Sequence, residues 1–175
     1  MTIGAVILLG TVMLNTNQGI NDSSGILRET SFTIEDVSYA TTIIQKAEGV
    51  YFDEKCSTDT LEVSNPVTGF TAASSLGYEN SDPTDLDDVD DFNGKPGIAN
   101  GYRLDSANLA TGLYYAKTQV HYVSTNNLDA FVNTPTFHKR LDVWVWNHDE
   151  FDPNTNPARQ GDTLHMATII SYWAF

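Results

Sequence analysis

From Ile3 to Leu14 the chain is almost unbrokenly apolar, and the polar stretch "NTNQG" then interrupts this pattern. After the interruption, bulky residues return every three or four positions, which is the spacing of one face of an α-helix. These positions are Ile20, Leu27, Ile34, Val37, Ile44, Ala47 and Tyr51. No proline occurs before Pro66, so no such residue breaks the helix. The pattern predicts one continuous helix from the start of the chain to about Asp53, with this stripe as its buried face.

Such a helix is too long to be buried by its own domain. At 1.5 Å per residue it spans about 75–80 Å, whereas a compact chain of 175 residues has a radius of gyration of about 16 Å. We therefore expect about half of the helix, its apolar N-terminal half, to project from the rest of the protein. Glycines in this half cost about 1 kcal/mol each relative to alanine. They indicate either close helix–helix approach or local melting at "NTNQG", and they are Gly4, Gly10, Gly19 and Gly25.

The projecting half is expected to pack against copies of itself, because so large an exposed apolar surface would otherwise aggregate. About a dozen side chains, each stabilising by about 1.5–3 kcal/mol when buried, would contribute to this contact. The residues predicted to form the helix–helix contact are Met1, Ile3, Val6, Ile7, Leu8, Val12, Leu14, Ile20, Leu27 and Ile34.

Four other interpretations of the apolar N-terminus differ in how well they fit the sequence. A signal peptide normally carries a basic region before its apolar core, but no Lys or Arg precedes Arg28. We therefore expect the segment to be retained in the mature protein. A membrane span needs about 20 apolar residues, and the run from Ile3 to Leu14 is shorter. A partial or transient membrane anchor, and a helix buried in an ordinary globular core, remain as alternatives.

After Cys56 the pattern changes to short alternating runs separated by turn-forming residues. Residues 111–124, 138–148 and 164–175 are rich in β-branched and aromatic side chains and are predicted strands. Separations of about 10–20 residues favour an antiparallel sheet. In the first two runs, alternation puts on a common face Tyr114, Ala116, Thr118, Val120 and Tyr122, and likewise Leu141, Val143 and Val145.

These elements predict an α+β fold, in which a long helix precedes a small antiparallel sheet. We assign residues 1–55 to the N-terminal helix and residues 56–175 to a β-rich globular head. The sequence shows no internal repeat and no second pattern of a long helix.

The net charge of the chain disfavours two classes of binding partner. With 9 basic and 23 acidic residues the net charge is -14, which disfavours nucleic acid because phosphate binding needs clustered Lys and Arg. It equally disfavours an anionic membrane surface. Cys56 is the single cysteine, so no disulfide can form within the chain. We expect this thiol to be buried and inert, as free cysteines usually are.

An acidic segment from Ser81 to Gly97 is the strongest candidate for binding chemistry, because clustered hard oxygen ligands suit Ca²⁺. The EF-hand register fails, since no start position places the glycine that the loop requires at its sixth position. The alternative, which we favour, is a solvated loop whose aspartates cap turns. A Ca²⁺ site outside the EF-hand class would use Asp85, Asp87, Asp88, Asp90, Asp91 and Asn93.

No catalytic pattern accompanies these features. The chain contains no Gly-rich phosphate loop, no H-E-x-x-H, no C-x-x-C and no nucleophile elbow. His148, Asp149 and Glu150 could form an acid–base group, but a polar strand end explains them as well. We therefore expect a protein that is not an enzyme and needs no cofactor, with Ca²⁺ as the one ligand left open.

An apolar N-terminal helix that continues as an amphipathic helix into a β-sheet head resembles the bacterial type IV pilins and their prepilin-like relatives. The opening "MTIGAVILLG" is similar to a processed pilin start. Two further stretches resemble those of prepilin-like proteins: "LDDVDDFNG" is similar to an Asp-rich "DDxDDxNG" segment, and "TFHKRLDVWVW" to a "yKrxxVxVw" strand. The chain departs from the family at Ala5, where pilins usually carry a glutamate that neutralises a neighbour's terminal amine.

The resemblance implies a divergent pilin-like subunit that loses a short leader and contacts the inner-membrane secretion machinery transiently. It then implies assembly into a homo-oligomeric helical filament at the bacterial cell surface. A structural filament subunit is therefore the function we expect. A Ca²⁺-dependent surface adhesion module is the alternative, and a secreted hydrolase is a remote one.

Overall fold

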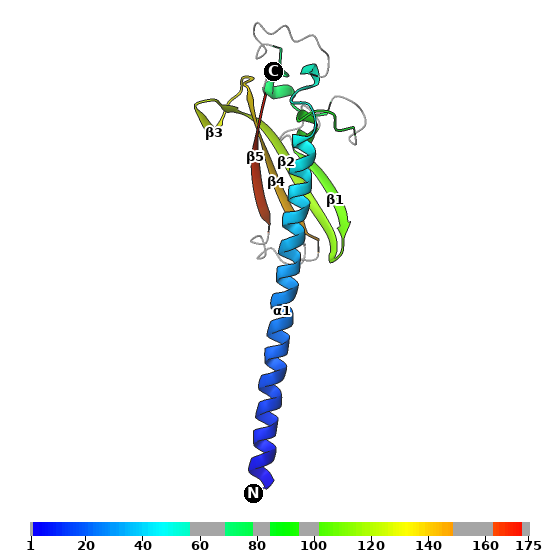
Figure 1. The fold of residues 1–175 in the computed structure, drawn as a ribbon, viewed down its shortest axis with the longest axis vertical. Helices are drawn as coiled ribbons and strands as arrows, with labels where there is room; N and C mark the ends of the chain where they lie inside the picture. The colour runs from blue at the N-terminus through cyan, green and yellow to red at the C-terminus, as the bar shows by residue number, and fades with distance from the viewer. Residues whose placement is uncertain (1, 57–68, 79–84, 95–101, 149–162, 173–175) are drawn as a thin grey trace.

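The computed structural model describes residues 2–56, 69–78, 85–94, 102–148 and 163–172, with side chains from residue 8 onward. It confirms the α+β fold (Figure 1). The helix α1 spans Thr2–Glu48, and short 3-10 helices follow it as η1 (Glu54–Cys56), η3 (Ala73–Ser75) and η4 (Asp90–Asn93). The strands are β1 (Arg103–Leu109), β2 (Gly112–Ser124), β3 (Asn127–Phe131), β4 (His138–Asn147) and β5 (Leu164–Ser171).

The N-terminal part of α1 projects well beyond the sheet, as expected from its length (Figure 1). Every described side chain from residue 8 to residue 31 is exposed, and Phe32 is the first buried residue. The helix runs without a break through "NTNQG". The alternative of local melting at that stretch is therefore wrong, since Asn and Gln cost a helix only a few tenths of a kcal/mol to about 0.7 kcal/mol each.

The helix ends at Glu48, five residues before the expected end at Asp53. Gly49 follows directly. Apart from proline, glycine has the lowest helix propensity of all residues. Beyond it the backbone is bound to the acidic segment instead: the Tyr51 N–H donates to the Asp87 carbonyl at 3.1 Å, and the Val89 N–H donates to the Tyr51 carbonyl at 2.9 Å. These bonds replace those of a further helical turn.

The sheet is antiparallel throughout, in the order β1-β2-β4-β5, with β3 paired to β2. The three predicted strands are present as β2, β4 and β5. Their alternation is confirmed, because the predicted common faces of β2 and β4 are the buried ones. Two strands were not predicted: β1 leaves most of its side chains exposed, and β3 is a short hairpin partner of β2. Neither has an apolar pattern, so both depend on backbone pairing with β2.

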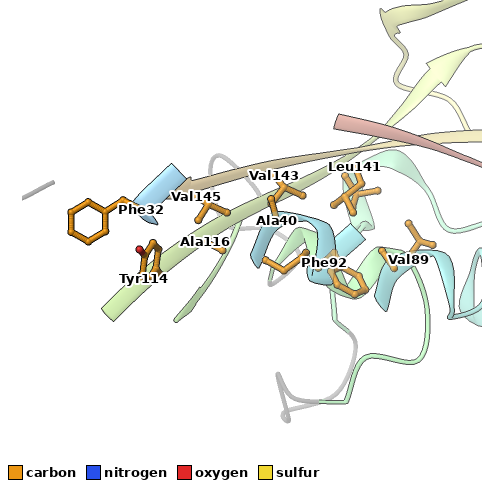
Figure 2. Packing of buried hydrophobic residues seen from close by; sticks show 12 residues of the cluster. Phe32, Ala40, Val89, Phe92, Tyr114, Ala116, Leu141, Val143 and Val145 are labelled. Carbon is orange, nitrogen blue, oxygen red and sulfur yellow. The ribbon is translucent and has the colours of Figure 1, made fainter. Parts of the chain in front are cut away.

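The C-terminal half of α1 lies across one face of the sheet and shares one core with it (Figure 2). A further contact fastens the helix to the β1–β2 turn, where the Thr111 N–H and hydroxyl donate to the Glu35 carboxylate at 3.2 and 2.7 Å. The buried side chains come from α1, from the segment around η4, from β2 and from β4, and they are Phe32, Ala40, Ile43, Ala47, Val89, Phe92, Tyr114, Ala116, Val120, Leu141, Val143 and Val145.

The buried face of α1 is not the stripe that the sequence predicted. Phe32, Asp36, Ala40, Ile43 and Ala47 face the sheet. Of the predicted stripe only Ala47 is buried and Ile44 half-buried, while the other members, Ile20, Leu27, Ile34, Val37 and Tyr51, are exposed. The helix carries apolar residues on two sides, and small residues such as Ala40 allow the close approach to the sheet that bulky ones would prevent.

Candidate functional site

The first candidate site is the surface of α1 that no other described part of the chain covers. Its large apolar side chains are exposed by between 41% and 68%, and they are Leu8, Leu9, Val12, Met13, Leu14, Ile20, Ile26, Leu27, Ile34 and Val37. An apolar surface on this scale marks a binding interface in a native protein. Among the described residues no helix combines the length and apolarity that a membrane span requires.

Six of the residues predicted for helix–helix contact lie on this surface: Leu8, Val12, Leu14, Ile20, Leu27 and Ile34. Met1 lies outside the described residues, and so do the side chains of Ile3, Val6 and Ile7. Four further exposed residues on this surface, Leu9, Met13, Ile26 and Val37, were not predicted to form the helix–helix contact.

A seven-residue spacing orders the middle of this surface. Met13, Ile20, Leu27 and Ile34 follow one another at seven-residue intervals, which keeps them on nearly one line along the helix. At 3.6 residues per turn this line lies roughly opposite Ala40 and Ile43, the residues that face the sheet. The helix therefore presents its second apolar face away from its own head, and we call Met13, Ile20, Leu27 and Ile34 the outer stripe.

Hydroxyl groups between the apolar residues are already satisfied within the helix. The Thr16 hydroxyl donates to the Val12 carbonyl at 2.8 Å, and the Thr30 hydroxyl donates to the Ile26 carbonyl at 2.8 Å. The hydroxyls of Thr11 and Ser24 make equivalent bonds one turn back. Burial of a polar group costs little once it is hydrogen-bonded. This surface can therefore be covered by another apolar surface without leaving these hydroxyls unpaired.

The charge of the chain is separated along its length. Residues 1–31 contain one basic and two acidic residues (Arg28, Asp22 and Glu29), so 8 basic and 21 acidic residues lie after them. Gly10, Gly19 and Gly25 have open space where a side chain would begin. The projecting half is thus nearly uncharged and smooth, while the head carries the acidic surface that keeps proteins soluble.

The second candidate site is a cluster of charged side chains inside the head. Lys139, Asp53, Asp88 and Asp90 are all fully buried. The Lys139 ammonium contacts Asp90 Oδ1, Asp53 Oδ2 at 3.3 Å, and the Phe52 carbonyl at 2.6 Å. The rings of Phe52 and Tyr122 lie 4.4 and 5.3 Å from the same nitrogen. One cation therefore holds two carboxylates in an apolar, aromatic surrounding.

This cluster joins two stretches that lie far apart in the sequence, "LDDVDDFNG" and "TFHKRLDVWVW". Asp90 belongs to "LDDVDDFNG" and Lys139 to "TFHKRLDVWVW". Asn93 extends the connection, because its amide donates to the Leu76 carbonyl and its oxygen accepts from the Val120 N–H at 3.0 Å. Gly94 follows with a φ of +75°, and a Cβ there would lie 2.3 Å from the Tyr102 carbonyl oxygen. The acidic stretch thus connects the end of α1 to the sheet through these contacts.

The description of residues 88–93 as a solvated loop is wrong, because all six are buried. Their predicted role in capping turns is confirmed. Asp88 Oδ1 accepts the backbone N–H of Asp90 at 2.6 Å, and Asp91 Oδ2 accepts that of Asp87 at 2.9 Å. Of the predicted Ca²⁺ ligands, only Asp85 and Asp87 are exposed.

The Ca²⁺ site stays a prediction. Within the described segments no group of three or more His, Cys, Asp or Glu side chains is arranged to hold a metal ion. The positive charge that reaches the buried carboxylates is the Lys139 ammonium. A cation bound by the remaining oxygens would have to compete with this lysine.

The stability of the head is expected to depend on the protonation of Asp91. Burial raises the pKa of this carboxyl from 3.8 to about 6. A folded pKa above the unfolded one stabilises the fold at low pH, and this contribution is lost as the pH rises from about 4 through about 6. The free energy of unfolding should therefore fall over this range, and less so in Asp91→Asn. Urea denaturation of residues 29–175 across the range measures both, and equal slopes would contradict the assignment.

Cys56 is a free, half-buried thiol in a second cluster with Phe52, Phe70 and Leu76. Burial raises its pKa to about 11, so the thiol stays protonated at neutral pH. The expectation of an inert thiol is consistent with this environment, although the side chain is less buried than expected.

The face of the sheet away from α1 carries a shallow pocket of about 190 Å³ lined by Lys117, Trp144, Trp146 and Thr163. The Trp144 ring stacks on His165 with centroids 4.8 Å apart, and the Lys117 ammonium lies 4.8 Å from the Trp144 centroid. These aromatic side chains leave the outer face of the head partly apolar.

Comparisons with protein-family models, with curated proteins and with solved structures found no match for this chain. Its function is therefore inferred from the geometry of α1 and of the head.

Proposed function

We propose that this chain is a structural subunit of an extracellular helical filament and that it assembles through the projecting half of α1. One observation carries the proposal: the helix leaves the head at Phe32 and presents an unpartnered apolar surface over residues 8–31. No described helix or strand of the head reaches this surface (Figure 1). Other copies of the same helix are the partner that matches its length, its apolarity and its near absence of charge.

The energetics favour many-subunit packing. Burial of a large apolar side chain contributes about 1.5–3 kcal/mol, and ten such side chains are exposed on α1. Their gross sum of about 15–30 kcal/mol equals or exceeds the roughly 4–15 kcal/mol that association costs in lost freedom. The seven-residue spacing of the outer stripe suits helices that cross at about 20°. In such a filament the helices form a central bundle and the acidic heads form the outer surface.

The part of the proposal that concerns processing, export and cellular location rests on the resemblance to prepilin-like proteins. The subunit loses a short leader, leaves the inner membrane through secretion machinery and is added to a filament on the bacterial cell surface. Ala5 replaces the glutamate that pilins use at this position, so charge pairing at the N-terminus has to differ from theirs. Apolar contacts along the outer stripe then contribute a larger part of the assembly energy.

Removal of the projecting helix tests the proposal directly. Residues 29–175 keep Phe32 and the rest of the buried face, so this fragment is expected to be a folded, soluble monomer. The full chain is expected to form ordered fibres in negative-stain electron microscopy, with the fragment as control. The proposal is contradicted if the fragment forms fibres. It is also contradicted if the full chain stays monomeric at concentrations where apolar surfaces associate.

A further inference from the structure

The buried cluster around Lys139 is sealed from solvent. The side chains of Lys139, Asp53 and Asp90 have no exposed surface. The hydrophobic cluster of Phe52, Phe70, Leu76 and Tyr122 lies beside them. Burial of charged groups in such a dry environment costs free energy. A nucleophile and an electrophile that are held in contact there react far faster than they do in water.

The charges in this place do not balance. One ammonium contacts the fully buried carboxyl groups of Asp53 and Asp90, and a third fully buried carboxyl group, that of Asp88, accepts the Asp90 N–H. Asp90 Oδ2 finds no hydrogen-bond partner among the described residues. An ionised carboxylate with a bare buried oxygen is strongly disfavoured relative to the neutral acid. Consistently, burial raises the pKa of Asp90 from 3.8 to about 8.

Asp53 differs from Asp90 in that both of its carboxylate oxygens accept hydrogen bonds from Thr71. The Thr71 N–H donates to Asp53 Oδ2 at 2.8 Å, and the Thr71 hydroxyl donates to Oδ1 at 3.2 Å. The Tyr122 hydroxyl adds a longer contact to Oδ2 at 3.4 Å. The Lys139 nitrogen is therefore in contact with two carboxyl groups, of which Asp90 has a bare oxygen and Asp53 is hydrogen-bonded at both oxygens.

We propose that the Lys139 side chain and the Asp90 carboxyl condense to an amide, an intramolecular isopeptide bond that joins β4 to η4, with Asp53 as the proton shuttle. The observations that carry this assignment are the contact between Lys139 Nζ and Asp90 and the complete burial of both groups. The bond belongs to the head and does not depend on how the chain assembles.

The reaction needs no other reactant. A proton of the ammonium passes to Asp90 Oδ1, and the neutral amine attacks Cγ of the resulting acid. Asp53 Oδ2, 3.3 Å from Nζ, takes a second proton from the nitrogen and returns it to the Oδ1 hydroxyl. The C–Oδ1 bond breaks and water leaves. The nitrogen starts with three protons and ends with one, which donates to the Phe52 carbonyl, while Asp53 is regenerated as the carboxylate.

The amide would remove one positive and one negative charge from the core at once. It would also close a covalent loop between positions 49 residues apart, which restricts the unfolded chain as a disulfide does. A filament subunit without any disulfide would gain from such a bond a resistance to unfolding that reducing agents cannot remove.

Intact-mass spectrometry of the purified full chain under denaturing conditions tests the proposal. We expect a mass lower than that of the sequence by one water molecule. We also expect a branched peptide, after proteolysis, whose fragment ions join Asp90 to Lys139. A full-sequence mass overturns the proposal, and so does a water loss that fragment ions place at another residue.

Variants separate this bond from other dehydrations. Lys139→Met should restore the full mass, whereas Lys117→Met on the outer face should keep the water loss. Asp53→Asn should form the amide at least ten times more slowly after refolding, while circular dichroism shows a folded head. If Asp53→Asn condenses at the wild-type rate, Asp53 is not the shuttle. If Lys139→Met still loses water, the bond is not the one proposed.

Discussion

Replacement of both Ile20 and Leu27 by aspartate is expected to abolish filament formation without altering the head. The two side chains lie on the outer stripe and are exposed by 61% and 68%. Against a neighbouring helix each aspartate would lose about 1.5–3 kcal/mol of apolar burial and leave an unpaired carboxylate in the interface. A loss of about 5 kcal/mol per subunit weakens association by more than about 10³-fold. Electron microscopy and sedimentation of the full chain measure this effect.

A matched control is available on the head. Leu104 and Leu128 are exposed leucines, by 56% and 41%, on β1 and β3. Their replacement by aspartate adds the same charge and removes similar apolar surface, yet it should leave filaments intact. Neither double variant alters the core that begins at Phe32. The free energy of unfolding of the head, measured by thermal denaturation, should therefore change by less than about 0.5 kcal/mol. Filaments of normal abundance in Ile20→Asp/Leu27→Asp would contradict the assignment of the outer stripe.

The existence and length of α1 follow from the sequence because apolar spacing and the absence of proline are local properties. The orientation of the helix does not follow. Both sides of α1 carry apolar residues. The size of these side chains alone predicted that Ile20, Leu27 and Ile34 lie on the buried face. The sheet instead packs against Ala40, Ile43 and Ala47, where the two alanines permit close approach and Ile43 fills the space between them. Such a choice depends on the shape of the partner surface, which no local pattern contains.

The acidic stretch shows a similar limit. A run of aspartates is typical of a solvated loop or of a cation site, and the partner that decides between them is Lys139, 49 residues from Asp90. One signal was available in the sequence. Lys139 has the same parity along its strand as Leu141, Val143 and Val145, so alternation already placed it on the buried face. A lysine at such a position requires buried carboxylates, and the acidic stretch is the richest source of them in the chain.

Replacement of Lys139 by methionine is expected to destabilise the head by about 3–5 kcal/mol at neutral pH, which is the usual cost of removing one partner from a buried ion pair. Methionine keeps most of the volume of the side chain, so the loss arises from charge. Asp53 and Asp90 would be left buried without a cation, and Asp88 lies beside them fully buried. The expectation holds for the ion pair and for the amide, because both require the Lys139 nitrogen. Urea denaturation of residues 29–175 provides the free energy of unfolding.

Two comparisons distinguish this electrostatic effect from a packing defect. Asp90→Leu should cost less than Lys139→Met, because the lysine keeps Asp53 and the Phe52 carbonyl as partners. The deficit of Lys139→Met should also shrink as the pH falls towards about 5, since carboxyl groups that lack a cation can then be buried as neutral acids. A cavity or a strained methionine would cost the same at every pH. A deficit that does not depend on pH, or an Asp90→Leu variant less stable than Lys139→Met, would show that Lys139 does not act by neutralising the buried carboxylates.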